Sequence, residues 1–423
     1  MMTTRFSLIA AIFALFVSVP ASAQLGVGGV QLGTQDLPGG LGGNLPDRVL
    51  DPVLNDVDDL TGEFSREALE LAEDRVRRLN RLVRRNRDMI ERDANGAPAR
   101  RGELLVMDAD AAAISRAEEQ GFRVLSTEEV DGLGIMVTRL AIPSGEDLDD
   151  AQEDLAELLP NATISADNLY FQSGGNAEPA SQDSAGPFGR NSTQTRVGMI
   201  DGAPSSSIPV RARRGFATGA GAASDHGSAV ASLLNRAGVR QILSADVYGS
   251  DPAGGNALAI ARALGWLVEE SAEVVTISLV GPDNSVLSRA IAAARGRGVV
   301  VVAAVGNDGP AAPAAYPASY DGVVAVTAVD RRERALIEAG RALHLDYAAP
   351  GADIYGLDRR GRNQRLRGTS YATPLVAARI ASALGRGSNW RSALDSEAHD
   401  LGPRGVDDTC GRGLVCRGCG ARR

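Results

Sequence analysis

Three side chains that could perform hydrolysis follow one another along the chain in the order Asp201, His226 and Ser370. Each stands where an apolar run meets a glycine-flanked turn or the start of a helical segment. A serine hydroxyl needs an adjacent base at neutral pH, and histidine suits this role because its ordinary pKa is about 6.5. A buried carboxylate can then fix the tautomer of the imidazole. These residue types predict hydrolysis through an acyl intermediate.

A fourth polar side chain, that of Asn307, ends an apolar run typical of a buried strand. A preorganised amide donor stabilises an oxyanion, and losing one such donor typically costs about 100- to 1000-fold in rate. Ser370 opens an apolar helical run, and the N-terminus of a helix favours negative charge at the same point. We expect Pro374 in the first turn of this helix and Gly385 as its C-cap. Asp225 is the expected N-cap of the helix that follows the histidine.

These segments resemble the subtilisin-like serine protease family over residues 196–415. The matching motifs cover residues 197–202, 225–231, 303–307, 316–318, 326–330, 348–351 and 368–374. The resemblance implies that Ser370 is the nucleophile, His226 the general base and Asp201 the orienting acid. It also implies that Asn307 and the backbone N–H of Ser370 stabilise the oxyanion.

The resemblance further implies a set of substrate-binding residues on two segments. They are Ser278, Leu279, Val280, Gly281, Ala303, Ala304 and Val305. The family usually has glycine at the position of Val280, in the segment that lines the S1 pocket of relatives. A β-branched side chain there is expected to narrow the pocket and to disfavour large aromatic P1 side chains.

Each motif alone has an ordinary interpretation as a turn, a helix cap or a chance Gly-Thr-Ser. Their order argues against an α/β-hydrolase esterase, which uses the order Ser, Asp, His. Every basic residue other than histidine is arginine, which excludes P-loop, Schiff-base and Ser–Lys chemistry. The sequence has no HExxH pair or EF-hand loop, so we expect no cofactor and no catalytic metal. Relatives often bind structural calcium, whose ligands the sequence leaves unassigned.

The beginning of the chain predicts export. Residues 1–23 have the pattern of a signal peptide, with a short apolar stretch and an Ala-Ser-Ala cleavage site before Gln24. The stretch is shorter than the ~20 residues of a membrane span, so no stable span is expected. Residues 24–62 have the composition of a disordered leader. We therefore expect the mature protein in the periplasm or outside the cell.

An arginine-rich segment, residues 63–100, follows the leader. Apolar residues near heptad spacing predict a helix over residues 65–92. Its arginine run is compatible with binding to nucleic acid or an acidic membrane. Neighbouring acidic residues, the net charge of −9 and the predicted export favour a solvated helix instead, with no nucleic-acid partner.

Residues 101–172 carry the pattern of a compact βαββαβ unit, the ferredoxin-like arrangement. The expected strands cover residues 103–107, 122–126, 135–140 and 162–170, and the expected helices cover residues 111–119 and 147–159. The unit resembles the inhibitor-type propeptides that precede subtilisin-like catalytic domains. Alone, such a unit could bind many partners, but its place before the protease segment favours a propeptide that binds its own enzyme.

Residues 173–195 have the composition of a polar linker, and residues 416–423 form a short tail. Between them, in residues 196–415, apolar runs alternate with helical stretches. This alternation predicts a doubly wound α/β catalytic domain with a mainly parallel sheet. Three cysteines near the chain end allow one bridge and leave one thiol over. They are Cys410, Cys416 and Cys419.

These features predict a secreted serine endopeptidase, made as a self-processing zymogen, that acts on proteins or peptides. In relatives the propeptide tail lies in the substrate groove as an added strand. We therefore expect the tail to pair with residues 279–281 and 303–305. Self-cleavage is expected between Tyr170 and Arg190, close to Gln172 and Ser173. The alternative is a self-cleaving regulatory or peptide-binding protein whose propeptide stays bound and which has little activity in trans.

Overall fold

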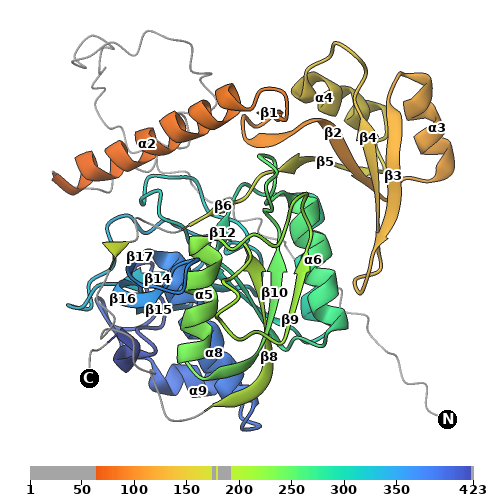
Figure 1. Cartoon of the computed structure of the whole chain (residues 1–423). Coiled ribbons are helices and arrows are strands. Elements are labelled where there is room, and N and C mark those ends of the chain that lie inside the picture. Colours follow the sequence, from red (N-terminus) through yellow and green to blue (C-terminus); the bar gives the residue numbers. More distant parts are fainter. Residues whose placement is uncertain (1–62, 174–177, 180–191, 421–423) are drawn as a thin grey trace, which may run out of the picture. The chain divides into compact units, whose positions relative to one another are not determined.

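The structure is a computed structural model that describes residues 63–173, 178–179 and 192–420. The expected signal peptide, residues 1–23, and the expected leader, residues 24–62, lie outside the described residues. Figure 1 shows the chain coloured along its sequence. Within the described ranges, no helix combines the length and the apolar character that crossing a membrane requires.

The arginine-rich segment forms helix α2 (Glu63–Arg85), which is shorter than expected. Asn86 follows it and donates its side-chain amide to a carbonyl of the last turn at 3.0 Å. Ile90 is fully buried, and β1 (Ile90–Arg92) pairs antiparallel with the start of β2 (Pro98–Met107). The prediction of a longer helix was wrong. Ile90 continues the apolar spacing of the helix, but it is buried by the pairing of β1 with β2.

The βαββαβ unit has the predicted order of elements. They are β2, α3 (Ala111–Glu119), β3 (Arg123–Val130), β4 (Ile135–Ala141), α4 (Leu148–Leu158) and β5 (Thr163–Asn168). Its strands pair antiparallel in the order β5-β2-β4-β3. Leu104 and Leu140 of the sheet share one buried cluster with Leu148 and Leu155 of α4. This is the expected ferredoxin-like arrangement.

A seven-stranded sheet forms the centre of the catalytic domain. Its strands, in spatial order, are β15 (Tyr347–Pro350), β14 (Val324–Val329), β13 (Val300–Ala304), β11 (Val274–Ile277), β8 (Thr193–Asp201), β10 (Val239–Asp246) and β9 (Ala212–Gly215). Each neighbouring pair is parallel. Val274 and Val275 enter different apolar clusters, so the two faces of β11 are both buried. Burial of both faces is typical of parallel sheets.

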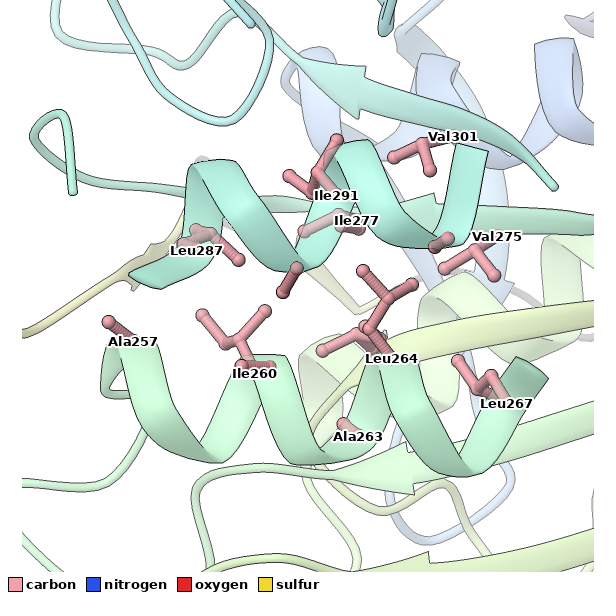
Figure 2. Close-up of a cluster of buried hydrophobic side chains, with 14 of the residues drawn as sticks. Ala257, Ile260, Ala263, Leu264, Leu267, Val275, Ile277, Leu287, Ile291 and Val301 are labelled. Atoms are coloured by element: carbon pink, nitrogen blue, oxygen red, sulfur yellow. The ribbon is translucent and has the colours of Figure 1, made fainter. Parts of the chain in front are cut away.

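Helices cover both faces of this sheet, which confirms the predicted doubly wound fold. On one face, α6 (Ala257–Glu269) and α7 (Ser285–Gly296) pack against β11 and β13 (Figure 2). On the other face lie α5 (Asp225–Arg236), α8 (Thr369–Leu384) and α9 (Trp390–Glu397). Because all seven strands are parallel, their carboxyl ends meet at one edge, where α/β enzymes place their sites.

Smaller pairings lie outside the main sheet. β16 (Ala352–Leu357) and β17 (Asn363–Arg367) form an antiparallel pair, to which β7 (Glu178–Pro179) adds. β12 (Leu279–Val280) pairs antiparallel with β6 (Phe171–Gln172). Residues before the main sheet thus contribute strands to the catalytic domain.

The end of the described chain contains a short helical turn, η3 (Arg417–Gly420). Cys416 and Cys419 form a disulfide, and Cys410 is a buried free thiol. Burial raises the pKa of Cys410 to about 11, so this thiol stays protonated at neutral pH. One bridge with one thiol left over is the outcome expected from the sequence.

Candidate active site

Asp201 ends strand β8, which lies between β11 and β10 in the main sheet, and is fully buried. Its Oδ1 accepts the backbone N–H of Gly202 at 2.7 Å and the side-chain amide of Gln172 at 3.1 Å. His226 lies in the first turn of α5, with Nδ1 at 2.8 Å from Oδ2 and 3.0 Å from Oδ1 of Asp201. An imidazole that donates its Nδ1 proton to a carboxylate presents Nε2 as an acceptor. The structure therefore brings the predicted base and the predicted acid together.

Ser224, and not the expected Asp225, caps helix α5. Its Oγ accepts the backbone N–H of Gly227 at 2.9 Å. Asp225 occupies the first turn, where its carboxylate accepts the backbone N–H of Arg359 at 3.0 Å. Ser224 takes the cap because it has the extended backbone conformation that an N-cap requires.

Ser370 is fully buried in the first turn of α8. Its Oγ donates to the carbonyl oxygen of Ser278 at 3.1 Å and lies 2.5 Å from Oγ of Ser173. Nε2 of His226 has no hydrogen-bond partner among the described residues. The hydroxyl of Ser370 is thus turned toward the chain's own residue 173 and not toward the ring. Hydrogen bonds between a nucleophile and its base often form fully only in the reacting complex.

Pro374 lies in the second turn of α8, not in the first as expected. Proline has no N–H, so the carbonyl of Ser370, four residues earlier, lacks its helical donor. The hydroxyl of Ser278 supplies the missing bond and donates to that carbonyl at 2.9 Å. Ser278 therefore contacts Ser370 twice, through its hydroxyl and through its carbonyl.

Asn307 follows Gly306, whose φ of +91° favours glycine. Its Oδ1 accepts the backbone N–H of Thr369 at 3.0 Å. A backbone N–H can only donate, so this bond decides which end of the amide is the oxygen. The other end, Nδ2, is buried and has no hydrogen-bond partner among the residues described. A buried unpaired donor costs roughly 1–3 kcal/mol, and at the start of α8 it is available to an oxyanion.

The chain's own tail occupies the groove beside these side chains. β6 pairs with β12, and the backbone N–H of Ser173 extends this pairing by donating to the carbonyl of Ser278 at 3.2 Å. On the other side of the tail, the N–H of Tyr170 donates to the carbonyl of Gly255 at 2.8 Å. The expected pairing with residues 303–305 was wrong, since that backbone already bonds to neighbouring strands of the main sheet.

Tyr170 anchors this tail, a role that the sequence did not indicate. Its ring is fully buried, its hydroxyl donates to the carbonyl of Pro282 at 2.7 Å, and its own carbonyl accepts the hydroxyl of Tyr248 at 2.8 Å. Burial raises the pKa of both tyrosines, which keeps both hydroxyls protonated as donors. A Cβ at Gly281 would lie 2.6 Å from the ring of Tyr170, so glycine makes room for this ring.

Val280 faces Gly306 across the predicted S1 pocket. A Cβ placed on Gly306 would lie 3.4 Å from Cγ1 of Val280, so one added carbon would fill the space between the valine and this glycine. Three predicted substrate-binding residues, Val280, Gly281 and Val305, line a cavity of about 1040 Å³. The two predicted alanines, in β13, are buried and do not line it.

Two polar residues of β5 contact the N-termini of α6 and α7. Asp167 is buried, and its Oδ1 accepts the backbone N–H of Leu258 in the first turn of α6 at 3.0 Å. Oδ1 of Asn168 accepts Nδ2 of Asn284, the N-cap of α7, at 2.9 Å. Burial raises the pKa of Asp167 to about 6, although Arg100 lies 3.9 Å away. The polar pair at the end of a buried strand was the only sequence signal for this contact.

The reactive groups at this edge of the sheet are a hydroxyl, an imidazole, a carboxylate and an amide. Together they can perform acyl transfer without a metal. In the part of the chain that the structure describes, no group of three or more His, Cys, Asp or Glu side chains could hold a metal ion. Structural calcium, which the sequence left open, stays without assigned ligands.

Known proteins resemble this chain in sequence. A family model described as the subtilase family, peptidase S8, matches residues 215–413. Subtilisin DY of Bacillus licheniformis is 31% identical over 238 residues, which cover 51% of this chain and 87% of that protein. Thermitase of Thermoactinomyces vulgaris is 33% identical over 191 residues, which cover 44% of this chain and 67% of that protein.

Solved structures resemble the chain in fold. Fervidolysin from Fervidobacterium pennivorans, a keratinolytic enzyme related to subtilisin, matches with a TM-score of 0.62 at 18% identity, over 76% of this chain and 61% of that one. The epidermin leader peptide processing serine protease of Staphylococcus aureus matches with a TM-score of 0.58 at 16% identity, over 75% of this chain and 98% of that one. At these identities the likeness shows the fold alone. The sequence matches go further, and they show that the chain belongs to the subtilase family of serine endopeptidases.

Proposed function

We propose that this subtilase is an exported endopeptidase made as a self-processing zymogen. In the proposed reaction, Ser370 attacks the peptide carbonyl while Nε2 of His226 takes its proton, and Asp201 stabilises the imidazolium that forms. Nδ2 of Asn307 and the backbone N–H of Ser370 stabilise the oxyanion. The imidazolium then protonates the leaving amine, and a water molecule activated by His226 hydrolyses the ester on Ser370.

The position of Ser173 is the observation that carries this proposal. Its N–H donates to the carbonyl of Ser278 at 3.2 Å, and its Oγ lies 2.5 Å from Oγ of Ser370. A peptide bound as an added strand is aligned by main-chain bonds, and alignment near attack geometry lowers the barrier. We therefore assign self-cleavage to the bond between Ser173 and Gly174, inside the stretch expected from the sequence.

The contacts of the tail also support inhibition after cleavage. Tyr170 stays buried and hydrogen-bonded on the amino-terminal side of the proposed cut, and β6 fills the strand position that a substrate would need. A cleaved prosegment that ends at Ser173 would therefore block the groove until it is degraded. Export rests on the signal-peptide pattern of residues 1–23.

The proposed substrates are proteins with small P1 side chains. One carbon added on Gly306 would already contact Val280, which leaves little room for an aromatic ring between them. Ser173, the residue proposed to occupy P1 in self-cleavage, is itself small. The chain's own processing site therefore fits the pocket that it is proposed to use.

N-terminal sequencing of the processed protein tests the assignment. We expect Gly174 as the first residue, together with casein hydrolysis that a serine-directed fluorophosphonate blocks. A first residue before position 162 or after position 197 would contradict the proposed boundary. Cleavage after Ser173 without casein hydrolysis, even when the prosegment has been removed, would instead indicate a protein that cuts only itself.

A further inference from the structure

Helix α2 contacts the catalytic domain beside the candidate active site, although it precedes the βαββαβ unit. Nε of Arg75 lies 3.2 Å from Oδ2 of Asp308, and a terminal nitrogen of Arg78 lies 2.5 Å from Oδ1. Asp308 directly follows Asn307. Two guanidinium groups therefore share one carboxylate in the loop that carries the amide donor.

Apolar contacts continue on both sides of these ion pairs. Near the start of the helix, Ala68 and Ala72 pack on Ala311, in the same loop as Asp308. Near its end, Leu82 belongs to a cluster that includes Phe171 of β6. One helix therefore contacts both the loop after the amide donor and the tail in the groove.

The helix also lines the cavity of about 1040 Å³ at the predicted S1 pocket. The lining includes Arg75 and Arg78 from α2, Ser173 from the tail, and Val280 and Asn307 from the catalytic domain. A protein substrate that approached the amide donor from this side would meet the helix first.

Two other arginines of α2 form no ion pair with the catalytic domain among the described residues. Arg77 forms its ion pairs within the helix, with Glu73 and Asp74. Arg84 is exposed near the end of the helix. The arginine-rich helix is thus solvated on one face and docked on the other, and the chain offers matched positions on both faces.

We propose that the loop from Asp308 to Ala311 is a docking surface for a basic helix, and that its occupant is this chain's own α2. In the docked position α2 is a second inhibitory element, which shields Asn307 and holds the tail in the groove. This inference rests on the proposed zymogen function, because the shield matters only while the prosegment stays bound after cleavage.

The first test compares the full chain with a docking variant, Arg75→Gln/Arg78→Gln, and a control variant, Arg77→Gln/Arg84→Gln. Both variants lose two positive charges. Gel analysis follows self-cleavage, and hydrolysis of a peptide substrate follows the appearance of activity. Because ion pairs at such exposure are individually weak, we expect the lag between cleavage and activity to shorten roughly 2- to 30-fold in the docking variant. We expect no change in the control, and a smaller difference at high salt.

A second measurement does not depend on cleavage. In chains that also carry Ser370→Ala, hydrogen exchange of the amides in residues 308–312 should be faster with the docking pair of substitutions than with the control pair. Equal exchange in the two chains, or equal lags in the first test, would overturn the docking proposal. A wild-type chain that never cleaves itself would contradict the zymogen function instead, and the exchange rates would then decide the docking question alone.

Discussion

Two neighbouring stretches of the chain contact the catalytic domain in different ways. At residues 167–168, side chains make the contacts: Asp167 binds a backbone N–H of α6, and Asn168 binds the N-cap of α7. At residues 171–173, the backbone aligns the chain, through the pairing of β6 with β12 and the N–H of Ser173, and the side chains of Gln172 and Ser173 add bonds to the candidate site. Only two residues, Leu169 and Tyr170, therefore separate a stretch held by side chains from a stretch aligned by main-chain bonds.

The two kinds of contact serve two properties of the molecule: a groove that accepts many peptide sequences, and specific binding of the prosegment. Main-chain pairing accepts many sequences, as the groove of an endopeptidase requires, and its selectivity comes from pockets for individual side chains. Contacts through buried polar side chains depend on residue identity, because a lost partner leaves a buried group unpaired. Variants in residues 171–173 should therefore change cleavage. Variants in residues 167–168 should change how tightly the prosegment binds.

The largest effect is expected from Ser370→Ala, which removes the chemistry and leaves both stretches in place. We expect loss of self-cleavage and a fall in kcat on the order of a million-fold, the size known for the triad of subtilisin, a family member. Gel analysis and N-terminal sequencing of the purified variant provide the measurement. Normal processing of this variant, with no active enzyme added, would show that the nucleophile lies elsewhere.

Asn307→Ala should leave the groove occupied but slow the reaction. The expected cost is about 100- to 1000-fold in kcat with little change in KM, the range known for this kind of donor in subtilisin. Because Asn307 also accepts the N–H of Thr369, Asn307→Asp is the matched variant. It keeps that acceptor and replaces the Nδ2 donor with a second acceptor oxygen, whose negative charge opposes the oxyanion. An unchanged kcat in the aspartate variant would remove Asn307 from the mechanism.

Asp167→Asn should change only the contacts of residues 167–168 and leave the main-chain pairing of residues 171–173 in place. Burial raises the pKa of Asp167 to about 6 against the lowering effect of the Leu258 N–H, so the folded chain favours the protonated acid. Its contribution to stability is fully present below the ordinary pKa of 3.8 and is lost as the pH rises through about 6. In the chain with Ser370→Ala, we expect stability to fall by up to about 3 kcal/mol between pH 4 and pH 8, and Asp167→Asn to remove this fall.

Denaturant unfolding across this pH range measures that effect. Asp149→Asn, at an exposed position of α4, is the matched control and should keep the pH dependence of the parent chain. The groups around Asp167 include Arg100, Glu103 and Arg139. A pH profile of the Asp167→Asn chain that matches its parent would assign the dependence to other groups.

The smallest effect is expected from Val280→Gly, which changes a pocket and leaves the main-chain pairing intact. Removing the side chain that narrows the space beside Gly306 should favour Phe and Leu at P1 by roughly 5- to 150-fold in kcat/KM, since overpacking costs about 1–3 kcal/mol. Val280→Thr keeps the shape and serves as the control. Identical P1 profiles for the glycine variant and the wild type would contradict the proposed role of Val280.

The sequence was most informative where burial is regular. The apolar run before Gly306 has no polar face, so both of its faces must be buried. A parallel sheet covered by helices on both sides provides this burial. The alternation in residues 101–172 likewise predicted the βαββαβ order. The reactive side chains could be proposed because their residue types and motifs are specific, while the present orientation of the Ser370 hydroxyl depends on a contact with Ser173 that no motif describes.

The sequence could not predict which of two nearly equivalent residues caps a helix, or where a helical pattern gives way to a strand. Ser224 and Asp225 are both good N-caps, and the backbone conformation decided between them. Ile90 continued the helical spacing, yet a strand pairing placed it in β1. The ion pair between Arg78 and Asp308 joins residues 230 positions apart, so no local pattern marks it.

Ser278 has a consequence for the precision of the reaction. Its carbonyl accepts both the N–H of Ser173 and the hydroxyl of Ser370, and its own hydroxyl holds the carbonyl that Pro374 leaves free. The bound peptide and the attacking residue are therefore positioned from the same reference point. A displacement of this segment carries both of them together, so the distance between the attacking oxygen and its target is protected from the motions of the surrounding protein.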